Sequence, residues 1–189
     1  MTIKTNFTRR QLLKAATGVA GLCAFPMVAR ATTLAAAPSL ARDLSLDHTH
    51  TLESIQLTYA FGRRYVPEAL KGLNHFLRDH YSGLVGNMDP ALYDILHSIQ
   101  ASLQARGSYQ IISGYRSPHT NERLRARGGG GVAKRSLHME GKAVDIRLPG
   151  VPLAELRDAA LELAVGGVGY YPGSDFVHVD TGRVRSWSG

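Results

Sequence analysis

The chain has 189 residues, of which 44% are hydrophobic, and this size suits one globular domain with a short appendage. Its formal net charge is +7, but residues 1–31 hold five of the 22 Lys and Arg residues and no acid, so the rest carries 17 basic and 15 acidic residues. A domain with nearly balanced charge gives no basis for nucleic-acid binding, and we expect no nucleic-acid partner.

Residues 1–31 have the pattern of an export signal. A basic region precedes an apolar stretch at 15–28, and the sequence Ala29-Arg30-Ala31 follows as a small-residue cleavage site. The apolar stretch is shorter than the roughly 20 residues that a membrane span needs. The segment TRRQLLK at 8–14 is typical of a twin-arginine signal. We therefore predict a twin-arginine-type signal peptide, the twin-arginine export machinery as a partner, a periplasmic location, and no stable membrane span in the mature protein.

The only cysteine, Cys23, lies inside this signal. The mature chain then has no disulfide and no thiolate, so any metal must be held by histidine and carboxylate side chains. Residues 32–42 are small and rich in alanine, which predicts a linker. Residues 43–189 are left as a single domain.

The first half of the domain is expected to contain one strand and two helices. Residues 54–61 alternate apolar and polar side chains, which is typical of a strand. Pro67 predicts the start of a helix. The pair Asp89-Pro90 predicts the cap and the first residue of a second helix, which Gly107 ends.

The second half is expected to contain most of the sheet. The pattern predicts strands at 109–113, 142–148, 167–171 and 175–180, helices at 118–127 and 152–165, and a glycine loop at 128–131. Helices that come mostly before an antiparallel sheet indicate the α+β class. We expect a small, mostly antiparallel sheet packed against about three main helices.

Two of these strands place polar side chains on a shared face. A period of two puts Phe176, His178 and Asp180 on one face of the last strand, and Asp145 projects from 142–148. If the two strands are neighbours, Asp145 and His178 point at one place, and His138 in the preceding loop completes the group. Two imidazoles and one carboxylate leave a tetrahedral position open, as in catalytic zinc sites. Taken singly, each histidine also fits an ordinary surface or hydrogen-bonded position.

The motif S-x-H-x-x-G-x-A-x-D at 136–145, followed by the strand residue His178, resembles the D-Ala-D-Ala carboxypeptidase and VanX-type zinc peptidases. The match extends upstream to SGYRS at 113–117. The likeness to the murein endopeptidases of this group spans nearly all of the mature chain. It implies a hedgehog/D-Ala-D-Ala peptidase-like fold that carries one Zn²⁺ per chain on its sheet.

The resemblance also implies roles for individual residues. His138, Asp145 and His178 are the expected zinc ligands. Arg116 is expected to bind substrate, to polarise the scissile carbonyl and to steady the oxyanion. Ser136 either contacts substrate or forms the turn that orients the loop.

The proton acceptor has two candidates. The related VanX-type enzymes carry a glutamate three residues before the last histidine, and here that position is Asp175, whose side chain is one methylene shorter. Asp180 is the preferred candidate because it shares a strand face with His178. Asp180 has a second interpretation, in which it orients the imidazole of His178 and takes no proton.

The predicted function is a zinc-dependent murein endopeptidase that hydrolyses peptide crosslinks of peptidoglycan between diaminopimelate residues. The alternatives are a D-Ala-D-Ala carboxypeptidase or dipeptidase, and a non-catalytic murein-binding module. Several basic residues near the glycine loop either meet acidic groups of the substrate or form a solvated face: Arg123, Arg125, Arg127, Lys134 and Arg135.

Overall fold

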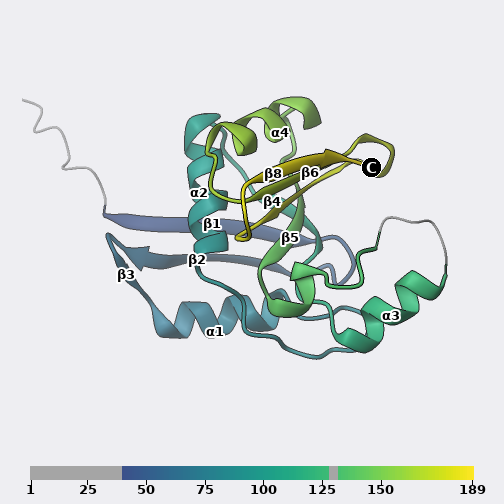
Figure 1. The fold of residues 1–189 in the computed structure, drawn as a ribbon. Helices are drawn as coiled ribbons and strands as arrows, with labels where there is room; N and C mark the ends of the chain where they lie inside the picture. Colours follow the sequence, from purple (N-terminus) through teal and green to yellow (C-terminus); the bar gives the residue numbers. More distant parts are fainter. Residues whose placement is uncertain (1–39, 128–131) are drawn as a thin grey trace, which may run out of the picture. The chain divides into compact units, whose positions relative to one another are not determined.

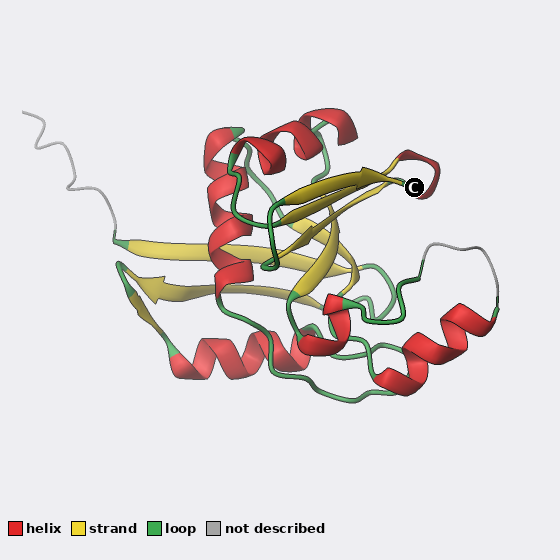
Figure 2. Ribbon diagram, in the orientation of Figure 1, coloured by secondary structure: helices red, strands yellow, loops and turns green. Residues whose placement is uncertain are grey.

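The computed structural model describes residues 40–127 and 132–189 (Figures 1 and 2). Both ranges belong to one compact unit. The expected signal at 1–31 and the glycine loop at 128–131 lie outside the described residues. Within the two described ranges, no helix has the length and apolar character needed to cross a membrane.

Eight strands form one sheet in the order β3-β2-β1-β4-β5-β7-β6-β8. Their bounds are β1 (Ala41–His48), β2 (Ser54–Phe61), β3 (Arg64–Tyr65), β4 (Tyr109–Ser113), β5 (Ala143–Arg147), β6 (Gly167–Tyr171), β7 (Phe176–Asp180) and β8 (Arg185–Ser188). The pairs β1–β4 and β6–β8 are parallel, and the other five pairs are antiparallel. The α+β class and the mostly antiparallel sheet are confirmed, whereas the expectation of a small sheet is wrong.

Strand β1 explains much of this difference. It begins at Ala41, so the last two residues of the expected linker at 32–42 belong to the sheet. Leu44, Leu46 and His48 alternate with more exposed residues and are buried. Paired with β2 on one side and β4 on the other, β1 lies inside the sheet, where its backbone groups find partners on both sides.

Four α-helices occur in the described part of the chain, namely the three expected as main helices and the short helix expected at 118–127. They are α1 (Pro67–Phe76), α2 (Ala91–Ser102), α3 (Pro118–Ala126) and α4 (Leu153–Glu162). Helix α1 packs on β2, α2 on β1, and α4 on β6 and β7. Helix α3 lies away from α2 and α4, near the connection that leads to β5 (Figure 1).

The helix ends mostly follow the sequence signals. Pro67 is the first residue of α1, and the hydroxyl of Ser117 caps α3 by accepting a hydrogen bond from Thr120 N. Helix α2 begins one residue later than expected, and Asp89 Oδ1 accepts from the N–H of Ala91. The same helix ends at Ser102, well before Gly107, and Gln104 just after it has a left-handed backbone with φ of 50°, which cannot continue the helix.

Strand β5 separates the hydrophobic core from the polar site. Val144 and Ile146 belong to the buried apolar cluster, together with Val177 and Val179 of the neighbouring β7. Asp145 projects from the other face of β5 and is also buried. A strand that is covered on both faces holds its side chains firmly, and this rigidity is what a catalytic constellation needs.

The turn before β5 depends on Gly141. A 3₁₀ turn at Leu137–Glu140 ends at Gly141, which has a left-handed backbone with φ of 67°. A Cβ atom at this position would lie 2.0 Å from the carbonyl oxygen of Asn87. The glycine therefore meets two requirements together, an unusual backbone conformation and a close approach between two segments.

We expect Gly141→Ala to destabilise the fold more than Gly150→Ala. Gly150 also has a positive φ, of 85°, but a Cβ there would meet no atom within 4 Å. Gly150→Ala should lower the free energy of unfolding only by the cost of the left-handed conformation, about 1–2 kcal/mol. Gly141→Ala adds the clash with Asn87. Chemical denaturation of the two variants measures this difference, and equal losses would contradict the proposed close approach.

Candidate active site

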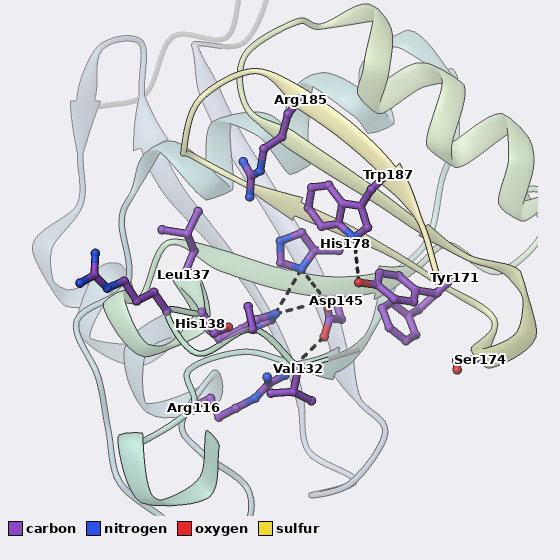
Figure 3. Close-up of a pocket in the computed structure, with 15 residues that line it drawn as sticks. Arg116, Val132, Leu137, His138, Asp145, Tyr171, Ser174, His178, Arg185 and Trp187 are labelled. Atoms are coloured by element: carbon purple, nitrogen blue, oxygen red, sulfur yellow. Dashed lines mark hydrogen bonds and ion pairs between the residues drawn. The ribbon is translucent and has the colours of Figure 1, made fainter. Parts of the chain in front are cut away.

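Three elements bring His138, Asp145 and His178 together. Asp145 in β5 lies directly opposite His178 in the antiparallel partner β7. His138 belongs to the 3₁₀ turn that precedes β5 and folds over this pair. The expected convergence of one loop and two strands is therefore present, and Figure 3 shows the three side chains pointing toward one another.

The potential ligand atoms are closely spaced. His178 Nδ1 lies 2.9 Å from Asp145 Oδ1, and His138 Nε2 lies 3.3 Å from the same oxygen and 3.2 Å from His178 Nδ1. Zinc binds nitrogen and oxygen at about 2.0–2.1 Å, so the ligand atoms of a tetrahedral site are about 3.4 Å apart. The chemistry and the spacing of these three side chains fit such an ion.

Both histidines have partners that orient their outer nitrogens. The carbonyl oxygen of Gly114 can only accept, so His138 donates from Nδ1 over 2.7 Å and keeps its Nε2 lone pair for the site. Asp180 accepts from His178 Nε2 at 3.1 Å, which leaves His178 Nδ1 facing Asp145. Histidine ligands of metals typically have such a second hydrogen bond.

Burial and charge determine the protonation of the group. Burial opposes ionisation of Asp145, but the charges and hydrogen bonds of His138 and His178 hold its pKa well below the usual range. Burial lowers the pKa of His138, and Asp145 partly offsets this effect. Burial also acts to lower the pKa of His178, yet its hydrogen bonds to Asp145 and Asp180 raise that pKa to about 9. A cation is favoured at this point, because the carboxylates stabilise positive charge.

Arg116 reaches the site from the loop between β4 and α3. Its Nη2 lies 3.9 Å from Asp145 Oδ2 and 3.4 Å from the hydroxyl of Ser113. Its backbone N–H donates to the carbonyl of His138, which links the two loops. The long side-chain contacts leave the guanidinium able to turn toward a bound group.

Ser136 lies at the start of the 3₁₀ turn. Its side chain is buried and lines the pocket, and its carbonyl accepts from the N–H of Met139. Both interpretations of Ser136, turn formation and substrate contact, fit this position.

The two proton-acceptor candidates lie in different surroundings. Asp180 is 0% exposed and bonds to His178, to Arg185 and to the backbone N–H groups of Gly167 and Gly182. Asp175 has a side chain that is 65% exposed and forms an ion pair with Arg147.

A pocket of about 720 Å³ opens in front of the triad. Its lining residues are Arg116, Val132, Ala133, Arg135, Ser136, Leu137, His138, Asp145, Tyr171, Ser174, Phe176, His178, Arg185, Trp187 and Gly189. Neither Asp175 nor Asp180 is among them. Trp187 donates from Nε1 to the hydroxyl of Tyr171 (Figure 3). The Tyr171 ring stacks on Phe176. An aromatic wall beside cationic groups can accommodate a peptide that carries carboxylates.

Sequence reasoning missed the part that Arg185 plays here. Arg185 forms an ion pair with Asp180 at 2.6 Å, and Trp187 packs beside His178 with ring centroids 5.2 Å apart. The short strand β8 was not predicted. In the sequence, Arg185 and Trp187 are two residues apart, as Gly167 and Gly169 are, and this shared period of two could have predicted that β8 is a strand.

The triad is expected to bind one divalent ion. Purified protein in zinc-replete buffer should contain about one zinc per chain by elemental analysis, because four-coordinate zinc needs these three ligands and one further position. His138→Ala removes one ligand and should reduce zinc to background. As a control, His119→Ala changes a histidine on the exposed side of α3 and should leave the zinc content unchanged. Full zinc content in the His138 variant would contradict the assignment.

Comparison with known proteins identifies the family of the chain. Residues 36–187 match the family model described as peptidoglycan L,D-endopeptidase MepK. The chain is 45% identical over 184 residues to the peptidoglycan L,D-endopeptidase MepK of Escherichia coli (strain K12) and to that of Shigella flexneri, which covers 97% of this chain and 99% of each relative. It is 42% identical over 149 residues to the probable peptidoglycan L,D-endopeptidase MepK of Haemophilus influenzae, with 78% of this chain and 80% of the relative covered. The chain therefore belongs to the peptidoglycan L,D-endopeptidase MepK family of M15 peptidases.

Proposed function

We propose that the protein is a zinc-dependent peptidoglycan endopeptidase that hydrolyses peptide crosslinks between diaminopimelate residues. The observation that carries this proposal is the buried triad of His138, Asp145 and His178, whose ligand atoms lie within 4.8 Å of one another at the base of an open pocket. The chain belongs to a family whose named members are peptidoglycan L,D-endopeptidases, and this membership supports the substrate class.

The three triad residues would hold the ion through His138 Nε2, Asp145 and His178 Nδ1. When bound, zinc supplies a Lewis acid that polarises a carbonyl group and makes water a nucleophile at neutral pH. Arg116 lies beside Asp145 and provides a cation that can turn toward the oxygen of the scissile carbonyl as negative charge develops on it. Pocket residues therefore bind and orient the peptide before its amide bond breaks.

The charge of the pocket suits the substrate. In a crosslink between two diaminopimelate residues, the carbon that bears the amide nitrogen also bears a free carboxylate. Arg116 and Arg135 line the pocket, and Arg135 makes no side-chain ion pair with another described residue. Of the five basic residues noted near the glycine loop, Arg135 is the one that lines this pocket, and we assign it to the carboxylates of the substrate.

Asp175 and Asp180 take different roles. Asp180 is fully buried and its oxygens already accept from His178, Arg185 and two backbone N–H groups, so it orients His178. Asp175 is assigned as the proton acceptor, because it lies between two pocket residues, Ser174 and Phe176, and its side chain is largely exposed. To accept a proton, its carboxylate has to leave Arg147 when substrate binds.

Purified protein incubated with defined muropeptides tests the activity. We expect crosslinked dimers to be converted to monomers, and a chelator to abolish the conversion until zinc is restored. Mass spectrometry of the products identifies the bond that is cut. Loss of a terminal alanine from monomers would support a D-Ala-D-Ala carboxypeptidase or dipeptidase instead. Retained binding with unchanged masses would support a murein-binding module.

Two variants in the same assay test the assigned roles. Arg116→Lys keeps the charge but loses the planar fork, so kcat should fall about 10²- to 10³-fold. Asp175→Asn should lower kcat by about 10²- to 10⁴-fold, the usual contribution of a general base. Zinc content should stay at the wild-type level in both variants. A wild-type kcat in Asp175→Asn would show that Asp175 is not the proton acceptor.

The protein is further assigned to the periplasm, where peptidoglycan lies, with the twin-arginine machinery as its route of export. The support is the segment at 8–14 with the paired arginines Arg9 and Arg10. Replacing both arginines by lysine keeps the charge and should retain the full-length precursor in the cytoplasm, as cell fractionation measures. Lys14→Arg is the matched control and should be exported. Normal export of the double-lysine protein would exclude this route.

A further inference from the structure

Strand β8 places two side chains directly behind His178. It pairs in parallel with β6, and the register sets Arg185 beside Gly167 and Trp187 beside Gly169. Because side chains alternate along a strand, Arg185 and Trp187 project to the same face. Figure 3 shows both on the side of His178 that faces away from His138.

Arg185 holds the carboxylate of Asp180 with two nitrogens. Its Nη2 donates to Asp180 Oδ2 at 2.6 Å and its Nη1 donates to Asp180 Oδ1 at 3.0 Å. The N–H groups of Gly167 and Gly182 add bonds of 3.0 Å and 2.8 Å to Oδ1. A carboxylate held by a two-nitrogen ion pair has little freedom to rotate.

This fixed carboxylate determines the orientation of the His178 imidazole ring. Asp180 Oδ2 accepts from His178 Nε2 at 3.1 Å, so His178 Nδ1 points at Asp145, 2.9 Å away. The Trp187 ring packs on His178, and the guanidinium of Arg185 lies 4.8 Å from the centre of that ring. His178 is therefore held both by a hydrogen bond and by an aromatic wall.

The two glycines of β6 provide the space for this arrangement. A Cβ atom at Gly167 would lie 2.2 Å from Arg185 Nη1 and 2.5 Å from Asp180 Oδ2. A Cβ at Gly169 would lie 2.6 Å from Trp187 Cε2. An alanine at either position would push the β8 side chain away from His178, although it would change no charge.

We propose that Arg185 is a positioning residue of the metal site, which acts through Asp180 to fix the orientation of His178, and that Gly167 is required because it leaves room for this ion pair. The inference rests on the proposed function in one respect, the role of His178 as a metal ligand. Arg185 lines the pocket but forms no hydrogen bond or ion pair with a triad residue, so its effect on His178 passes through the carboxylate of Asp180.

Zinc affinity measured by competition with a chromophoric chelator tests the proposal. Arg185→Ala and Gly167→Ala should each weaken zinc binding by about 10- to 100-fold, the usual effect of losing an outer-sphere partner. Arg185→Lys keeps one charged donor and should restore part of the affinity. Arg183→Ala removes the same charge from the exposed loop before β8 and should bind zinc as the wild type does.

A second measurement separates positioning from a general loss of structure. In the zinc-loaded protein with ¹⁵N-labelled histidine, the wild type and Arg183→Ala should show a slowly exchanging proton on His178 Nε2. This signal should broaden or disappear in Arg185→Ala and return in part in Arg185→Lys. Thermal unfolding identifies any variant that fails to fold. If Gly167→Ala fails to fold, the comparison of Arg185→Ala with Arg185→Lys still tests the proposal.

Wild-type zinc affinity and an unchanged Nε2 proton in folded Arg185→Ala would overturn the proposal. Equal losses in Arg185→Ala and Arg183→Ala would also overturn it, since the effect would then be one of overall charge. Neither result touches the proposed function, which is tested by the conversion of crosslinked muropeptides by the wild-type protein. Failure of the wild type to bind zinc would instead reject the proposed function.

Discussion

The pairing of β5 with β7 is the constraint on which the rest of the site depends. It sets Asp145 opposite His178 and Ala143 opposite Asp180, with Val144 and Val179 facing the core. Because side chains alternate along strands, a shift of one residue would turn the valines toward the site and bury the polar groups in the core. Packing of the hydrophobic core therefore stabilises this strand register, and the register positions the polar groups in the site.

The site gathers several charged groups where water is scarce, and each has a compensating partner. Asp145 is held by two imidazoles and lies near Arg116, and Asp180 is held by Arg185 and by backbone N–H groups. Burying a charge without such partners costs several kcal/mol. These contacts explain how an otherwise costly cluster remains in the fold, and they keep the imidazoles aimed at one point.

Much of the fold and site could be predicted from local patterns. The strand at 54–61, the helix that starts at Pro67 and the alternation around Asp145 and His178 all appear where the sequence indicated. Residues 41–42 of β1 fall in the expected linker and residues 43–48 match no predicted element, because the assignment of so short an alternating pattern depends on pairing with distant strands. The four-residue strand β8 was not predicted for the same reason, and the contacts of Arg185 were therefore not predicted either.

From the sequence alone, the class of the protein and the three expected metal ligands follow from a motif that resembles a known peptidase family, and the face on which each strand residue lies follows from a period of two. The surroundings of the two aspartates follow from the tertiary structure alone, in which Asp180 is buried and faces Arg185, whereas Asp175 is exposed and pairs with Arg147. The physical reason is distance along the chain. Which donors surround a carboxylate depends on strands that become neighbours only after folding. The spacing of residues within one segment does not indicate which strands these are.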